Sequence, residues 1–130
     1  MKIDPRSHLP IYLQIAEGIR AAVAAGVYRP GEALPSLRTM AIQLQVNPNT
    51  VQRAYDELDR EGLIYCQRGK GLFVAEQGTS AAQSRACDTV RKSFEEGIRS
   101  GRAAGLDPER LRELFEAAID GASQTRSHPS

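Results

Sequence analysis

The amino-acid sequence predicts a mainly α-helical protein with one small β-hairpin. Two amphipathic helical segments lie a few residues apart between residues 34 and 64, and two short runs of β-forming residues follow within 63–75. A second pair of amphipathic segments occupies residues 84–121. These observations divide the chain into a first domain at 1–76, a linker or loose helix start at 77–83, a two-helix region at 84–121 and a flexible tail at 122–130.

The composition is that of an ordinary folded chain, with 41% hydrophobic and 25% charged residues. A net charge of +1 gives no argument for nucleic-acid binding, so such an argument must rest on where the charges lie. No segment is typical of a signal peptide or a membrane span, which predicts a cytoplasmic protein without membrane contact. Cys66 and Cys87 are then expected as reduced thiols. His8 and His128 lie near opposite ends, and no Cys/His spacing suits a metal, which predicts no metal, no cofactor and no catalytic residue.

The first helix is predicted over residues 10–25, because one of its faces carries apolar residues at helical spacing. These residues are Ile11, Ile15, Ile19, Ala22 and Val23. Gly26 is expected to end the helix in a left-handed conformation, while Gln14 and Arg20 are expected to be solvated. Residues 28–34 then form a turn and a short extended segment that can add a strand to the later β-hairpin.

Clear start signals mark both helices of the next pair. Ser36 can accept a hydrogen bond from an unpaired backbone N–H at the start of the first helix, which contributes about 1 kcal/mol. Asn47 is a favoured N-cap for the second helix, and Pro48 suits its first position because no intrahelical hydrogen bond is lost there. The apolar stripes of the two helices are Met40, Ala41 and Leu44, then Val51, Ala54 and Leu58. Two short helices joined by a tight turn make a helix-turn-helix.

The outward face of the second helix carries polar side chains of the kinds that read DNA. Asn49 and Gln52 can pair bidentately with adenine. Arg53 can contact guanine or phosphate, and Thr50 at the helix start can reach phosphate or base. No acidic residue lies within 33–55, and the positive end of the helix dipole also favours an anion. A merely solvated helix face is the alternative interpretation.

A basic β-hairpin is predicted directly after the helix-turn-helix. Its strands fall within 63–67 and 72–75, on either side of a turn that reads Arg68-Gly69-Lys70-Gly71. The turn lacks the length and the Lys-Ser/Thr ending of a phosphate-binding P-loop. Basic residues at the tip favour a contact to the DNA backbone or the minor groove.

Residues 10–75 resemble the winged helix-turn-helix of the GntR family of bacterial transcription regulators. The motifs that carry the resemblance are Leu34-Pro35-Ser36-x-Arg38, Asn47-Pro48-Asn49-Thr50-Val51, Glu61-Gly62-Leu63-Ile64 and Gly69-Lys70-Gly71-x-Phe73-Val74. The resemblance implies that Arg38 contacts the DNA backbone, that residues 47–52 lie in the major groove and that Gly69 lies at the minor groove. Many relatives carry Arg or Ser at the position of Pro48, and the Asn-Pro-Asn-Thr turn is similar to the short YtrA-type subfamily. The residues predicted to bind DNA are Ser36, Arg38, Asn47, Asn49, Thr50, Gln52, Arg53, Arg68, Gly69 and Lys70.

The C-terminal region is predicted to be a two-helix dimerisation hairpin. One helix spans about 86–104, and the second begins at Asp107-Pro108-Glu109, with Asp107 as its N-cap and Pro108 at its first position, and ends near Gly121. Gly97 and Gly101 in the first helix suggest a close helix approach or a bend. The large apolar residues that need cover are Val90, Phe94, Ile98, Leu111, Leu114, Phe115 and Ile119. Because two such helices bury little on their own, a second copy of the hairpin is the favoured cover, and the winged domain of the same chain is the alternative.

The residues and the resemblance together predict a sequence-specific repressor, not an enzyme, that binds a two-fold operator in double-stranded DNA as a homodimer. The alternative is a winged-helix module that docks to other proteins and has no operator of its own. A small-molecule effector, of unknown identity, would be expected at the dimer interface or between the hairpin and the winged domain.

Overall fold

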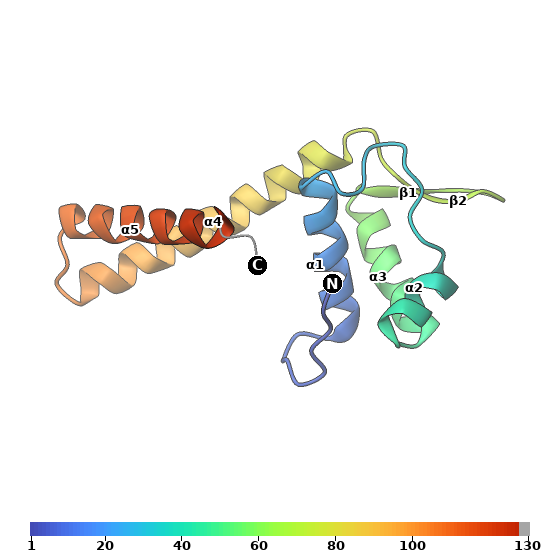
Figure 1. Cartoon of the computed structure of the whole chain (residues 1–130), viewed down its shortest axis with the longest axis horizontal. Helices are drawn as coiled ribbons and strands as arrows, with labels where there is room; N and C mark the ends of the chain where they lie inside the picture. Colours follow the sequence, from blue (N-terminus) through green and yellow to red (C-terminus); the bar gives the residue numbers. More distant parts are fainter. Residues whose placement is uncertain (128–130) are drawn as a thin grey trace. The chain divides into compact units, whose positions relative to one another are not determined.

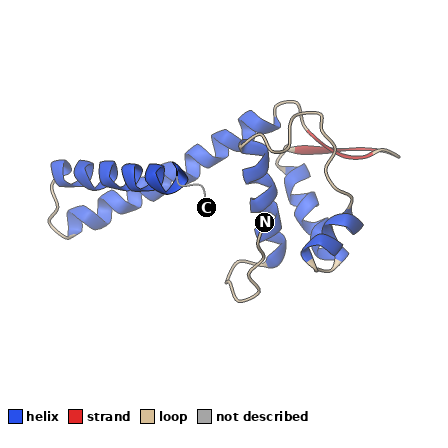
Figure 2. Cartoon of the chain, viewed as in Figure 1, coloured by secondary structure: helices blue, strands red, loops and turns tan. Residues whose placement is uncertain are grey.

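The computed structural model describes residues 1–127, with side chains as far as Ala122, and is mainly helical (Figure 1, Figure 2). Its elements are α1 (Ile11–Ala24), α2 (Leu37–Leu44), α3 (Pro48–Arg60), β1 (Ile64–Gln67), β2 (Gly71–Val74), α4 (Gly78–Ala103) and α5 (Pro108–Ser127). The chain forms two compact units, one from Met1 to Cys87 and the other from Asp88 onward. The predicted fold class, a winged helix-turn-helix followed by a helical hairpin, is confirmed.

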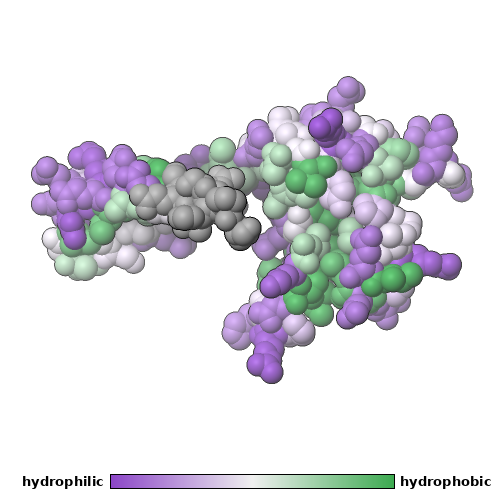
Figure 3. Space-filling view, in the orientation of Figure 1, coloured by the Kyte–Doolittle hydropathy of each residue, from purple (hydrophilic) through white to green (hydrophobic). Residues whose placement is uncertain are grey.

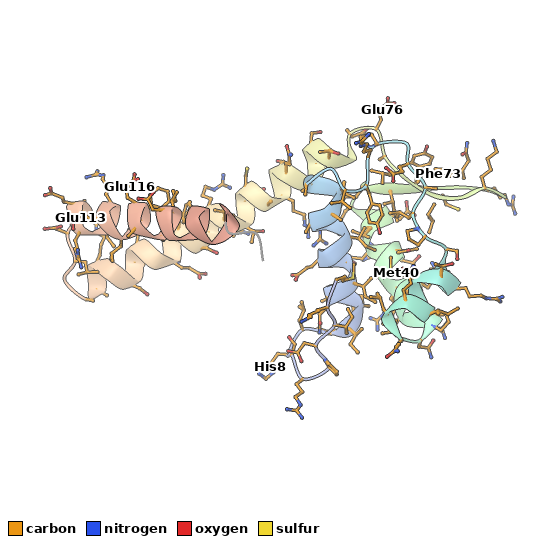
Figure 4. All side chains as sticks on the ribbon, in the orientation of Figure 1. His8, Met40, Phe73, Glu76, Glu113 and Glu116 are labelled. Atoms are coloured by element: carbon orange, nitrogen blue, oxygen red, sulfur yellow. The ribbon has the colours of Figure 1, made fainter. Side chains whose placement is uncertain are left out.

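The N-terminal unit, called the winged domain below, surrounds one hydrophobic core. The helix α3 packs against both α1 and α2, and Figure 1 shows it between them. Met40 of α2 points into this region in Figure 4. Fully or almost fully buried side chains from all its elements make up the core, namely Ile15, Ala16, Ile19, Val23, Leu34, Met40, Ala41, Val51, Ala54, Tyr55, Leu58, Leu63, Ile64, Val74 and Ala82.

The ends of α1 are fixed by two different devices. At the C-terminus, Gly26 takes a φ of 80°, and its N–H donates to the Val23 carbonyl while the N–H of Val27 donates to Ala22. This is the predicted left-handed end. At the N-terminus, the Gln14 amide accepts from the Asp4 N–H at 2.7 Å and donates to the carbonyls of Asp4 and Leu9 at 2.9 and 2.8 Å. The expectation that Gln14 is merely solvated was therefore wrong, because its side chain folds the preceding loop over the first turn of α1.

The helix-turn-helix follows its predicted caps. The Ser36 Oγ accepts from the Thr39 N–H at 3.1 Å, and the Asn47 Oδ1 accepts from the Asn49 N–H at 2.8 Å. Between the helices, Gln45 adopts a left-handed conformation with a φ of 57°, although no glycine marks this position. This conformation turns the chain within three residues and directs α3 across α2.

The wing is an antiparallel pair in which Ile64 lies opposite Val74 and Tyr65 opposite Phe73. Ile64 and Val74 are buried against the core, while the rings of Tyr65 and Phe73 stack at 5.7 Å on the other face. The predicted extra strand is present as a single bridge between Ala33 and Phe73. Backbone hydrogen bonds of the residues on either side of Ala33 extend this pairing. The winged domain therefore attaches its hairpin to the core by one face only.

The linker expected at 77–83 is corrected, because α4 begins at Gly78 and residues 78–83 are helical. Its first turns belong to the winged domain. A Cβ at Gly78 would lie 3.0 Å from the Leu63 carbonyl oxygen, Ala82 is 1% exposed, and the Gln83 amide donates to the Ala24 carbonyl at 3.0 Å. Small residues that suggest a loose linker here serve as close-packing positions instead.

The start of α4 is also held by charge. The Glu61 carboxylate accepts from the Arg20 guanidinium at 3.0 and 2.7 Å, and it pairs with Arg85 of α4 at 2.9 Å. The side chains of Arg20 and Glu61 are only 17% and 10% exposed. The expectation that Arg20 is solvated was therefore wrong, since it links α1 to the end of α3 and thereby to α4.

The second unit contains the rest of α4 and α5, called the C-terminal hairpin below. A Cβ at Gly101 would lie 2.5 Å from the Leu111 side chain, which confirms the close approach predicted at this glycine, whereas Gly97 has open space around it. The Asp107 carboxylate caps α5 by accepting from the Arg110 N–H at 2.9 Å. The predicted helix end at Gly121 was wrong, as was a tail from 122, because α5 continues to Ser127. Residues 128–130, including His128, lie outside the described residues.

Candidate nucleic-acid interface

The outward face of α3 presents the side chains predicted to read DNA. Asn49, Gln52 and Arg53 are exposed, and Thr50 is half-buried at the start of the helix. The first turn of α3 contains no acidic residue, so nothing in it offsets the positive end of the helix dipole. Asn49, Gln52 and Arg53 therefore occupy one accessible surface, on the side opposite the buried stripe of the helix, and Thr50 lies at its edge.

Two of these side chains are engaged with other residues of the chain. The Gln52 amide donates to the Asp56 carboxylate at 2.8 Å, one helical turn further along. The Arg53 guanidinium carbon lies 4.0 Å from the centroid of the Tyr12 ring, which belongs to α1. The sequence indicated the exposure of Gln52 and Arg53 but not these partners.

The start of α2 adds a second group of exposed side chains. Ser36 donates its hydroxyl proton to Thr39 Oγ1 at 2.9 Å while capping the helix, and Arg38 is exposed on the first turn. Among the described residues, Arg38 makes no hydrogen bond or ion pair. Its charge is therefore available to an anion.

Tyr55 fixes the start of α2 relative to α3, a role that the sequence analysis missed. Its side chain is buried, and its hydroxyl donates to the Pro35 carbonyl at 2.8 Å. Burial, with a smaller contribution from Tyr28, raises the pKa of the Tyr55 hydroxyl above its ordinary value, so the hydroxyl remains a donor. The signal was present, because Tyr55 falls on the helical stripe of Val51, Ala54 and Leu58.

The wing tip carries the third group, and in Figure 1 the hairpin of β1 and β2 extends beyond the helices of the winged domain. Arg68, Gly69 and Lys70 are all exposed, and Figure 3 shows hydrophilic residues at this tip. Gly69 and Gly71 have φ values of 79° and 115°, which L side chains rarely adopt. The glycines therefore allow the tight turn that places two cations at its end.

The C-terminal hairpin carries a different kind of surface. Six large apolar side chains are 42–50% exposed, and Phe94 and Phe115 meet edge to face at 5.4 Å between ring centroids. We call these side chains, with the half-buried Leu111, the hairpin apolar face. Its residues are Val90, Phe94, Ile98, Leu111, Leu114, Phe115 and Ile119. The seven residues predicted for dimerisation thus form a largely uncovered apolar surface along α4 and α5.

Comparisons with known proteins agree with this architecture. The sequence profile described as "Bacterial regulatory proteins, gntR family" matches residues 11–74. The chain is 36% identical over 116 residues to the HTH-type transcriptional repressor YtrA of Bacillus subtilis, covering 89% of each chain. It is similar to a solved GntR family transcriptional regulator from Listeria monocytogenes, with a TM-score of 0.76, 31% identity and coverage of 88% of this chain and 98% of that one. A DNA-binding domain of AraR, solved in complex with operator ORX1, matches 58% of this chain and 93% of its own at a TM-score of 0.53 and 31% identity.

These features define a winged helix-turn-helix protein with an exposed recognition helix and a basic wing. The chain belongs to the GntR family of bacterial regulatory proteins. It is a DNA-binding transcription regulator and not an enzyme. Within the described part of the chain, no helix is both long enough and apolar enough to span a membrane.

Proposed function

We propose that this regulator is a repressor that binds a two-fold operator as a homodimer. The observation that carries the proposal is the combination of two surfaces in one chain. The winged domain presents α3, the start of α2 and the wing tip as accessible polar and basic groups, and the C-terminal hairpin presents an uncovered apolar face. The first surface suits one half of an operator, and the second suits a second copy of the chain.

On the DNA, α3 enters the major groove, where Asn49 and Gln52 read base edges. Gln52 leaves or shares its hydrogen bond with Asp56 when it does so. Asn47 keeps its Oδ1 on the Asn49 N–H, which leaves its amide N–H groups for DNA. Thr50 and Ser36 add contacts at the helix starts, where backbone N–H groups favour phosphate.

Arg38 and the wing cations act mainly through the DNA backbone. Phosphate contacts fix register and orientation, whereas base contacts carry the sequence preference. Arg68 and Lys70 reach the backbone beside the minor groove, and Gly69 allows the wing to approach closely. The slope of log K against log salt is negative, and each lost phosphate contact reduces its magnitude by about 0.9 on duplex DNA.

The dimer is proposed because the hairpin apolar face needs cover. A symmetric pair buries the same face on both chains and places two recognition helices on one side of the duplex, one helical turn apart. Repression is proposed from the likeness to YtrA, which is described as a repressor. A dimer held over a promoter blocks access to it.

The test is a titration of the full-length protein against DNA from upstream of its own gene, with excess competitor DNA, followed by reporter measurements with that fragment. We expect a specific complex of two chains per site and lower reporter output when the protein is present. Asn49→Ala and Gln52→Ala should each cost about 1–3 kcal/mol on the best site and relax the preference there. Arg38→Ala is the matched variant, because it should weaken all duplexes alike. Binding without sequence preference would contradict the operator, and unchanged preference in both base-reading variants would contradict the proposed register of α3.

A further inference from the structure

Arg53 is the one predicted DNA-binding side chain whose guanidinium rests on an aromatic ring. Its Cζ lies 4.0 Å from the centroid of the Tyr12 ring. Tyr12 is half-buried on the first turn of α1, beside Ile11 and ahead of the fully buried Ile15. Because α1 packs along α3, the core holds the ring in place under the exposed arginine.

No ion pair neutralises the charge of Arg53 within the part of the chain that the structure describes. On a helix, the natural partners of Arg53 are the acids three and four residues along, Asp56 and Glu57. Asp56 accepts a hydrogen bond from Gln52 at 2.8 Å, and Glu57 pairs with Arg60 at 2.8 Å. Among the described residues, Arg53 makes no hydrogen bond or ion pair. A full positive charge and its N–H donors therefore remain available.

The ring also decides where that charge is held. At 100° per residue, Arg53 lies on the α1 side of the outward face of α3, and Gln52 lies on the other side of Asn49. A guanidinium drawn toward α1 is displaced from the middle of the face, where base edges are read, toward the sugar-phosphate edge of the groove. Stacking on a ring leaves the in-plane N–H groups of arginine free for a phosphate and removes side-chain freedom before binding.

We infer that Arg53 binds a DNA phosphate on the α1 side of the recognition helix, and that Tyr12 is the positioning residue that holds it there. This deepens the proposed function and rests on it for the DNA partner. The assignment separates Arg53 from Asn49 and Gln52, which read bases. It also gives the first turn of α1 a part in DNA binding that packing alone does not require.

The test uses the full-length chain with Arg53→Gln, Tyr12→Leu, Tyr12→Phe and the double variant of Arg53→Gln with Tyr12→Leu. Binding is measured by fluorescence anisotropy on the upstream duplex and on a scrambled duplex of equal composition, each over a series of salt concentrations. Thermal unfolding of each variant reports on the fold. Tyr12→Phe keeps the aromatic ring and serves as the matched control.

Arg53→Gln should reduce the magnitude of the slope of log K against log salt by about one on both duplexes. The ratio of the affinities for the two duplexes should stay unchanged. Tyr12→Leu should weaken binding about two- to fivefold, the range of an exposed cation–π contact, while Tyr12→Phe binds like the unaltered protein. In the Arg53→Gln background, Tyr12→Leu should have no further effect on binding.

Two results would overturn the inference. A change of the affinity ratio in Arg53→Gln would make Arg53 a base reader. Equal losses from Tyr12→Leu with and without Arg53 would reduce Tyr12 to a structural residue. Failure of the proposed function is distinguishable. An unaltered protein that binds both duplexes equally would refute the operator, but the effect of Arg53→Gln on the salt slope and the energetic coupling between Arg53 and Tyr12 could still be measured. An unaltered protein that binds neither duplex would refute both.

Discussion

Large apolar residues form a buried core in the winged domain but mostly remain exposed in the C-terminal hairpin. In the winged domain, Ile15, Ile19 and Leu58 have no exposed surface. In the hairpin, Phe94 and Phe115 remain 50% and 42% exposed although they contact one another. One region therefore completes its core within a single chain, and the other leaves six large apolar side chains 42–50% exposed.

The difference shows which part of the chain is self-sufficient. Three helices, a hairpin and the first turns of α4 surround the core of the winged domain, whereas two helices can cover each other on one side only. Exposed apolar residues in such a continuous row are typical of an interaction surface. The same helix, α4, takes part in both regions, since Ala82 is buried in the winged domain and Val90 is 46% exposed.

The largest effect is expected from charge placed on the hairpin apolar face. Phe94→Glu should weaken self-association by at least about 100-fold, because a two-fold interface would contain the buried carboxylate twice. Sedimentation equilibrium would measure the change. Glu113→Gln is the matched control, since Figure 4 shows Glu113 and Glu116 on α5 projecting away from α4. A Phe94→Glu protein that associates as tightly as the unaltered chain would contradict the role of this face.

Replacing one leucine by alanine in each region tests the contrast between the buried core and the hairpin apolar face. Leu58→Ala should lower the free energy of unfolding by about 2–5 kcal/mol at every protein concentration, because it leaves a cavity in a closed core. Leu114→Ala removes a side chain that is 44% exposed in the single chain, so its cost should rise with protein concentration. Denaturant unfolding at several concentrations measures both. The comparison fails if the two variants show the same concentration dependence.

The charged cluster at the start of α4 should have an intermediate effect. Glu61→Gln removes the charge that holds Arg20 and Arg85, and it should cost about 1.5–3 kcal/mol of stability in the winged domain. The same change at Glu113, whose pair with Arg110 is exposed, should cost less than about 1 kcal/mol. If chemical denaturation showed equal losses of stability for Glu61→Gln and Glu113→Gln, the partial burial of Glu61 would contribute nothing to stability.

The smallest effect is expected in the turn between α2 and α3. Gln45 adopts a left-handed conformation that glycine adopts without strain, so Gln45→Gly should raise stability by about 0.5 kcal/mol after the entropy cost of glycine. Gln43→Gly lies inside α2 and should lower stability by about 1 kcal/mol. Thermal unfolding would show whether each variant gains or loses stability. A loss of stability in both variants would contradict the account of this turn.

Local signals made most of the fold predictable from the sequence. Ser36, Asn47 and Asp107 were identified as helix caps because their chemistry acts within three residues of the chain. The left-handed turn at Gln45 was not predictable, since no glycine or asparagine marks it. The sequence left the start of α4 open between a linker and a loose helix start, because the close packing of Gly78 depends on Leu63, which is distant in the chain.

The exposure of the residues in the candidate site was predictable from the sequence, but the contacts that they make within the chain were not. Polar residues opposite an apolar stripe gave the outward face of α3, since periodicity alone decides which side is exposed. The partners of those residues come from elsewhere in the chain or from competing neighbours. Arg53 rests on Tyr12, 41 positions earlier, and the hydroxyl of Tyr55 reaches Pro35, 20 positions earlier. Such contacts depend on how α1 and α2 pack, which no local pattern specifies.

The most direct test of the central claim compares the full-length protein with a chain that ends at Cys87, the boundary of the winged domain. Both are measured by sedimentation equilibrium over the same concentration range, with circular dichroism to confirm folding. The account predicts that the full-length protein is a dimer and that the shorter chain is a folded monomer. A shorter chain that dimerises as tightly as the full-length protein, or a full-length protein that stays monomeric throughout, would contradict it.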